Sequence, residues 1–168
     1  NCTFKKNKLM TLGENFKQMN IIHAALCIGC ALVIFVMYNL VKQDENVIPS
    51  ANIIISVLGV AIAFINVMLS RFLFFMRTRQ GQTTNDFSQK INIFRAAFII
   101  QMAMLEGAAI INIIFYFLTK DKLHFFIAIG VLLLMVMRRP TRSMAAITLF
   151  SSKDDNIQRI YDDSIEVY

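Results

Sequence analysis

The chain has 168 residues, of which 57% are hydrophobic, and its mean hydropathy is +0.57. This composition is far more apolar than that of an ordinary soluble domain. The net charge is +6, but the Lys and Arg residues lie between long apolar blocks. The composition therefore excludes an ordinary soluble domain and makes nucleic-acid binding a poor explanation of the positive charge.

Four apolar stretches are candidate transmembrane helices, each of which needs about 20 apolar residues to cross a hydrocarbon core about 30 Å thick. In chain order they cover residues 21–41, 51–76, 96–119 and 123–137. The fourth is the shortest, so Lys122 and Arg138 must extend its reach by snorkelling, and a re-entrant fourth segment remains an alternative. We predict an all-α membrane domain over residues 19–137, between an N-terminal segment (1–18) and a tail (138–168).

The positive charges predict how the four spans are oriented. Lys and Arg concentrate before the first span, between the second and third spans, and directly after the fourth. The expected interface anchors among them are Arg77, Arg79, Arg95, Arg138 and Arg139. Because Lys and Arg are retained on the cytoplasmic side, we predict an up-down-up-down bundle with both termini in the cytoplasm.

Small residues four positions apart predict close contacts between membrane helices. The pairs are Ala25 and Gly29, Gly59 and Ala63, and Ala103 and Gly107. In the tail, Ser152 followed by Asp155 is a capping pattern that predicts a short cytoplasmic helix near residues 153–162.

The sequence contains no nucleotide-binding loop, no cluster of metal ligands and no catalytic arrangement. Cys27 and Cys30 form a C-x-x-C pattern, but they lie on an apolar helix without a second cysteine pair, which favours packing over metal or redox chemistry. We therefore expect a protein that is not an enzyme and holds no metal and no cofactor.

One carboxylate interrupts the third span. Glu106 lies 11 residues after Arg95, which is expected at the interface. At about 1.5 Å per residue, Glu106 is roughly 16 Å deep, near the middle of the bilayer. A charge there costs at least about 3 kcal/mol, and a low-dielectric environment favours the neutral acid. We expect Glu106 to face the protein interior, pair with a cation or carry a proton.

Two side chains of the second span are candidate partners of Glu106. Asn66 lies 11 residues before Arg77 and could donate a hydrogen bond to the carboxyl at a similar depth. Arg71 is nearer the cytoplasm and either snorkels to the interface or reaches the carboxyl. His23, on the first span, either joins such a polar track or lies at the interface.

Other polar residues of the third span point away from Glu106. Gln101 and Asn112 lie about 140° and about 120° around the helix from it. Two interpretations of Glu106 therefore stay open. It is a proton- or cation-binding site, or it makes a structural hydrogen bond or ion pair that fixes helix register.

The stretch RAAFIIQMAMLEGAA, residues 95–109, resembles the second helix of the membrane-rotor c subunits of F- and V-type ATPases. In those subunits an interfacial arginine is followed 11 residues later by the ion-carrying carboxylate. The resemblance covers the second and third spans, and it implies that Glu106 is an ion-binding residue.

A second resemblance covers most of the chain. The order IIHAAL, FRAAFIIQMAMLEGAA, NIIFYFLT and RRPT is similar to a family of small bacterial four-helix inner-membrane proteins of uncharacterised function, centred on an R-x-A…LEGAA helix. This resemblance implies a multi-pass protein of the bacterial inner (cytoplasmic) membrane, and it implies no activity.

These observations lead to two expectations about function. The first is a non-enzymatic membrane protein in which Glu106 binds a proton or cation within a homo-oligomer or beside other membrane subunits. The alternative is a structural or accessory subunit in which Glu106 only fixes helix packing. In both cases the expected partners are the lipid bilayer and other membrane helices, and not nucleic acid.

Overall fold

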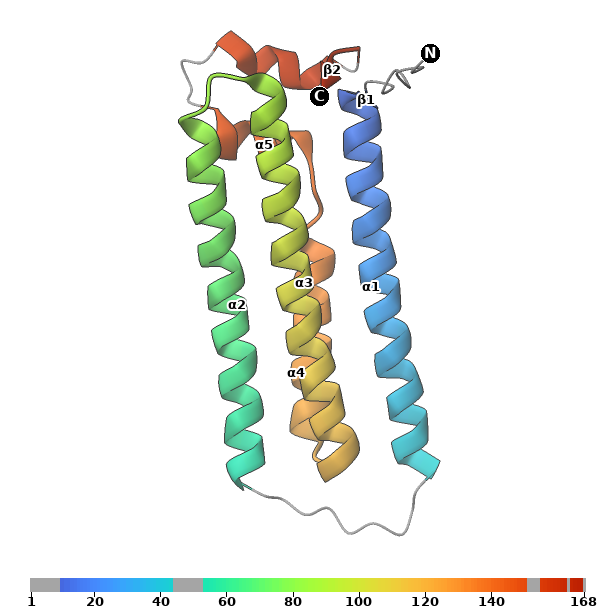
Figure 1. Cartoon of the computed structure of the whole chain (residues 1–168). Coiled ribbons are helices and arrows are strands. Elements are labelled where there is room, and N and C mark those ends of the chain that lie inside the picture. The colour runs from blue at the N-terminus through green and yellow to red at the C-terminus, as the bar shows by residue number, and fades with distance from the viewer. Residues whose placement is uncertain (1–9, 44–52, 151–154, 163, 168) are drawn as a thin grey trace, which may run out of the picture.

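The computed structural model describes residues 10–43, 53–150, 155–162 and 164–167. In this part of the chain, four long helices run in alternating directions and shorter elements close one end of the bundle (Figure 1). The long helices are α1 (Leu12–Gln43), α2 (Ile53–Gln82), α3 (Phe87–Thr119) and α4 (Lys122–Met137). The shorter elements are α5 (Arg142–Leu149), the 3-10 helix η1 (Asp155–Tyr161), β1 (Met10–Thr11) and β2 (Glu166–Val167).

The beginning and the end of the described chain meet at one end of the bundle, because β1 pairs with β2 in antiparallel register. We call this the terminal end. There α1 and α3 begin and α2 ends, whereas the shorter α4 ends before it reaches this end (Figure 1). We call the opposite end, where α3 turns into α4, the far end.

Three of the long helices, α1, α2 and α3, are long and apolar enough to cross a membrane. The fourth, α4, has 16 residues and meets this test only together with α5, which follows after a bend of 84°. The chain is therefore a helical membrane protein, as its composition predicts. Four complete spans with both termini in the cytoplasm stay a prediction, and so does the re-entrant alternative for the fourth segment.

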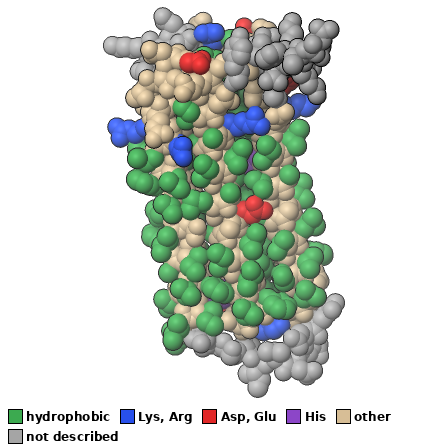
Figure 2. All heavy atoms as spheres, viewed as in Figure 1, with side chains coloured by type: hydrophobic (Ala, Val, Ile, Leu, Met, Phe, Trp, Pro, Cys, Tyr) green, Lys and Arg blue, Asp and Glu red, His purple; other side chains and the backbone are tan. Residues whose placement is uncertain are grey.

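The central helix is α3, which packs against α1, α2 and α4. Figure 1 shows α1 and α2 on either side of it, with α4 behind. In its most apolar stretch α3 is 44% buried, whereas the corresponding stretches of α1 and α2 are only 22% and 17% buried. Most of the apolar surface of α1 and α2 therefore faces outward, where it forms the apolar band of Figure 2.

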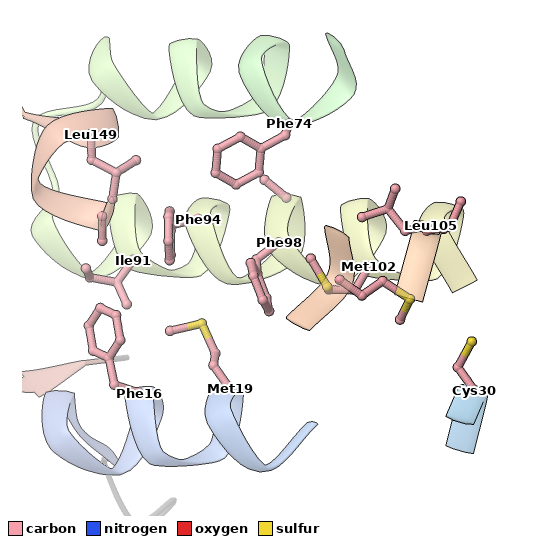
Figure 3. Packing of buried hydrophobic residues seen from close by; sticks show 14 of the residues in the cluster. Phe16, Met19, Cys30, Phe74, Ile91, Phe94, Phe98, Met102, Leu105 and Leu149 are labelled. Atoms are coloured by element: carbon pink, nitrogen blue, oxygen red, sulfur yellow. The ribbon is translucent and has the colours of Figure 1, made fainter. Parts of the chain in front are cut away.

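A dense aromatic core lies at the terminal end, partly outside the predicted spans. The helix α1 starts at Leu12 and α3 at Phe87, so each adds turns that continue the bundle beyond the apolar stretch. The Phe94 ring is fully buried, with its centroid 6.4 Å from that of Phe16 and 5.9 Å from that of Phe74 (Figure 3). Side chains from the tail complete this core.

The tail contributes Leu149 of α5 and Ile160 of η1 to that core, and both are fully buried. The helix α5 was not predicted. The short helix predicted near residues 153–162 corresponds to η1, although residues 151–154 lie outside the described ranges. The basic residues Lys5, Lys6 and Lys8 of the N-terminal segment lie outside them as well.

The turn between α3 and α4 is fixed by two residues at the far end. Lys120 adopts a left-handed conformation with φ of 59°, and its N–H donates to the Tyr116 carbonyl at 2.8 Å, which ends α3. Asp121 then caps α4, because its carboxylate accepts from the Leu123 N–H at 2.9 Å. This tight turn places the first residues of α4 directly against α2 and α3.

Candidate functional site

Glu106 lies on the side of α3 that faces Cys27 and Cys30 of α1. Its side chain is partly buried. In Figure 2, acidic side-chain atoms reach the surface halfway along the bundle and are surrounded by hydrophobic side chains. Among the described residues, Glu106 has no hydrogen-bond or ion-pair partner.

The structure does not bring the two candidate partners to the carboxylate. Asn66 donates to the Ile62 carbonyl of its own helix at 2.9 Å. Arg71 lines a small cavity together with Arg138, at the end of α4. Within the described chain, Glu106 therefore receives no hydrogen bond from α2.

His23 lies inside the bundle, at the contact between α1 and α4. Its Nε2 is 2.9 Å from the Met135 carbonyl, and its ring centroid is 5.9 Å from that of Phe98. The Cys27 thiol lies 3.7 Å from the same Nε2. His23 therefore joins α1 to α4 and does not contact Glu106.

The predicted small-residue pairs separate into two groups. Gly59 and Ala63 are buried between helices. Ala103 is exposed, and a Cβ added to Gly107 would meet no atom within 4 Å. We call Ala103, Glu106 and Gly107 the open face of α3. On α1, Ala25 is exposed and Gly29 also has open space beside it.

The five interface anchors lie on the side of the bundle toward the terminal end. Arg77 and Arg79 are exposed near the end of α2, and Arg138 and Arg139 directly follow α4. Arg95, in the third turn of α3, is partly buried, and its Nη1 donates to Asn15 Oδ1 at 3.4 Å. Their clustering at one end agrees with a role at a membrane surface.

A second polar cluster joins α2, α3 and α4 toward the far end. The sequence alone does not predict it. The fully buried Asn112 amide donates to the Gly59 carbonyl of α2 at 3.3 Å and to the Ala108 carbonyl at 3.0 Å. Its Oδ1 lies 3.2 Å from Nδ1 of His124 on α4, so the neutral imidazole donates from Nδ1. His124 is fully buried, and its Nε2 has no partner among the described residues.

Gly59 makes this contact possible. A Cβ at Gly59 would lie 2.6 Å from His124 Nδ1, closer than side-chain carbons approach a ring. The glycine therefore allows the His124 ring to lie directly on the α2 backbone, within reach of Asn112. We call Ser56, Gly59, Asn112, Asp121 and His124 the His124 cluster.

Asp121 forms the outer part of the His124 cluster. The Ser56 hydroxyl of α2 donates to its carboxylate at 2.9 Å. The Leu123 N–H lowers the pKa of Asp121 most strongly, and the Ser56 hydroxyl also lowers it, against an opposing effect of burial. A charged Asp121 thus holds α2 and the start of α4 together.

The geometry of the His124 cluster does not suit nucleophilic catalysis. In a catalytic triad, the histidine takes the proton of the hydroxyl and the carboxylate orients the histidine. Here the Ser56 hydroxyl donates to Asp121, and His124 bonds to Asn112. Among the described residues, no group of three or more His, Cys, Asp or Glu side chains could hold a metal ion.

The two polar sites of α3 thus differ in whether their polar groups have hydrogen-bond partners. Asn112 and His124 are buried and most polar groups of the His124 cluster have partners, as in a structural contact, whereas Glu106 on the open face has none among the described residues. Comparison of the chain with protein-family models, with curated proteins and with solved structures found no match.

Proposed function

We propose that this chain is a non-enzymatic, multi-pass membrane protein in which Glu106 binds a proton or a cation at a contact with another membrane-embedded chain. The position of Glu106 carries the proposal, because a carboxyl halfway along an apolar helix has no partner among the described residues. An uncompensated charge at that depth costs about 3 kcal/mol or more. A bound proton, a bound cation or a donor from another chain removes this cost.

The surroundings of Glu106 support a contact with a second chain. Ala103 and Gly107 leave open space beside the carboxyl, and small residues allow membrane helices to approach closely. A helix of a second copy, or of another membrane subunit, would fit against this open face. Glu106 would then lie inside the assembly, and not against lipid.

Charge and sequence resemblance support the location that we propose. The interface anchors gather at the terminal end, which the proposal places on the cytoplasmic side of a bacterial inner membrane. Residues 95–109 resemble the ion-carrying helix of rotor subunits, and this resemblance supports an ion-binding role for Glu106. No catalytic residue and no cofactor are part of this proposal.

Labelling with a hydrophobic carbodiimide tests the proposal, because the reagent modifies protonated carboxyls inside membranes. The full chain is labelled in lipid vesicles at several pH values, with and without Na⁺, and Glu106→Gln serves as the control. We expect modification at Glu106 that slows as pH rises or as Na⁺ is added. Labelling that is absent, or that neither pH nor Na⁺ changes, contradicts the proposal.

The alternative is an accessory subunit in which Glu106 only fixes packing against a partner. The outward apolar faces of α1 and α2 favour it, because they offer a large surface to other helices. Removing the tail from Arg142 onward would not test it cleanly, since α5 buries Leu149 in the core of the chain itself. Glu106→Gln is the better test, and unchanged partners with unchanged cellular function would favour the accessory role.

A further inference from the structure

Two arginines from different helices lie close together at the terminal edge of the apolar band. Arg71 of α2 and Arg138 after α4 line a cavity of about 40 Å³, together with the buried Ser70 and Gln101. Burial and then the charge of Arg71 lower the pKa of the Arg138 guanidinium, as expected for two cations at short range. Among the described residues, neither guanidinium has a carboxylate partner.

The cavity also has an unsatisfied polar group in its wall. Gln101 is only 1% exposed, and its Oε1 has no hydrogen-bond partner among the described residues. The oxygen and nitrogen of a side-chain amide are assigned from their contacts. Exchanging Oε1 and Nε2 of Gln101 would place an N–H donor where the unsatisfied oxygen lies. Ser70 does not donate into the cavity, because its hydroxyl donates to the Val67 carbonyl at 2.8 Å.

These groups match the chemistry of an oxyanion. A guanidinium offers paired N–H donors that fit two oxygens of one phosphate. The cavity is larger than the roughly 10–15 Å³ that one water needs, so an oxygen of such a group can enter it. A negative charge between the guanidinia would also remove their mutual repulsion.

We propose that Arg71 and Arg138 bind one phosphate group between them, with Gln101 as an additional donor. This site is separate from Glu106, and it does not depend on the proposed function.

The position of the site favours the phosphate of a lipid. Arg71 is exposed and lies 18 residues along α2 from Ile53, so at about 1.5 Å per residue it is about 27 Å from the far end. That distance is close to the thickness of a hydrocarbon core of about 30 Å. Head groups of anionic phospholipids lie at this level, where basic pockets between helices bind them.

Thermal unfolding of the purified, delipidated full chain tests this site. Phosphatidylglycerol, phosphatidylcholine and inorganic phosphate are added separately. We expect phosphatidylglycerol to raise the Tm, and its apparent affinity to fall at least tenfold in Arg71→Gln and in Arg138→Gln. The matched control is Arg77→Gln, an exposed arginine of the same helix outside the cavity, which should bind like the unaltered chain.

A second readout separates binding from a structural role. Without lipid, Arg138→Gln should raise the Tm, because it removes the repulsion from Arg71, whereas with phosphatidylglycerol it should lower the Tm relative to the unaltered chain. Arg71 is exposed, so Arg71→Gln provides a folded variant if Arg138→Gln does not fold. A purely structural arginine would not show this reversal.

The lipid and phosphate additions identify the source of the group. A Tm shift with inorganic phosphate but not with phosphatidylglycerol, lost in Arg71→Gln, supports the site and assigns it to free phosphate. Equal shifts with phosphatidylcholine and phosphatidylglycerol that Arg71→Gln and Arg138→Gln leave unchanged would overturn the proposal. So would a loss of binding in Arg77→Gln as large as that in Arg71→Gln, because the response would then be general charge attraction.

Discussion

Two polar side chains of α3, Glu106 and Asn112, lie six residues apart and have opposite surroundings. Asn112 is fully buried and bonds to Gly59 of α2 and His124 of α4. Glu106 is partly buried on the side of α1 and has no partner among the described residues. The difference indicates that Asn112 joins the helices of this chain, whereas Glu106 is the residue that we propose binds a proton or a cation.

These surroundings predict that two glycine substitutions change the free energy of unfolding in opposite directions. Gly59→Ala places a methyl group against the His124 ring, so it should lower the free energy of unfolding by about 3 kcal/mol through overpacking and lost hydrogen bonds. Gly107→Ala, beside Glu106, meets open space and should raise it by about 0.5–1 kcal/mol through helix propensity. Unfolding in detergent measures both, and equal losses would contradict the contrast.

Removing the amide of Asn112 should cost less than overpacking Gly59. Asn112→Leu leaves the buried Nδ1 of His124 without its partner, which should cost about 2 kcal/mol. The double variant Asn112→Leu with His124→Phe removes both partners and should recover part of that loss. A double variant as unstable as the sum of the single ones would show that the two side chains are not coupled.

Removing the cap of α4 should lower the free energy of unfolding by a smaller amount, and that amount should depend on pH. Asp121→Ala should cost about 1 kcal/mol. Because folding lowers the pKa of Asp121 below its ordinary value of 3.8, its charge stabilises the fold above that pH, and this stabilisation is lost as the pH falls through the folded pKa.

Asp121→Asn keeps a capping side chain without the titration, so it is the matched control. The stability difference between the native chain and this variant should therefore shrink on acidification from about pH 6 to about pH 3. Unfolding curves across that range measure it, and a difference that stays constant would exclude the Asp121 charge as the cause.

Glu106→Gln should change the stability of the isolated chain least, by less than about 0.5 kcal/mol. The carboxyl has no partner among the described residues, and in our proposal a bound proton or cation neutralises it, so the amide loses no contact and removes no unpaired charge. Unfolding of the purified protein and carbodiimide labelling of the same sample measure the two properties together. A loss of several kcal/mol would mean that Glu106 is a structural residue like Asn112.

The sequence predicts the long helices well, because hydropathy alone marks an apolar stretch. The predicted fourth segment, residues 123–137, differs from α4 by one residue. The predicted first and third spans start near the edge of the apolar stretch, but α1 and α3 continue to Leu12 and Phe87. These extra turns are stabilised by tertiary contacts of Phe16 and Phe94, which a hydropathy window cannot detect.

The polar sites are predicted less completely, because their contacts join helices that are distant in sequence. The depth of Glu106 follows from its spacing to Arg95. The sequence does not show that Glu106 has no partner on α2. The predicted fourth segment contains His124, but the contact of its ring with Asn112 depends on how α3 and α4 pack. The approach of Arg71 to Arg138 likewise depends on how α2 and α4 are aligned.

Infrared difference spectroscopy of the full chain in lipid bilayers tests the role of Glu106 most directly. Spectra of the native chain and of Glu106→Gln are compared between about pH 5 and about pH 9, with and without Na⁺. We predict a band of a protonated carboxyl that changes with pH or with Na⁺ and is missing from the Glu106→Gln spectra. Native spectra that match those of Glu106→Gln under all these conditions would contradict proton or cation binding at Glu106.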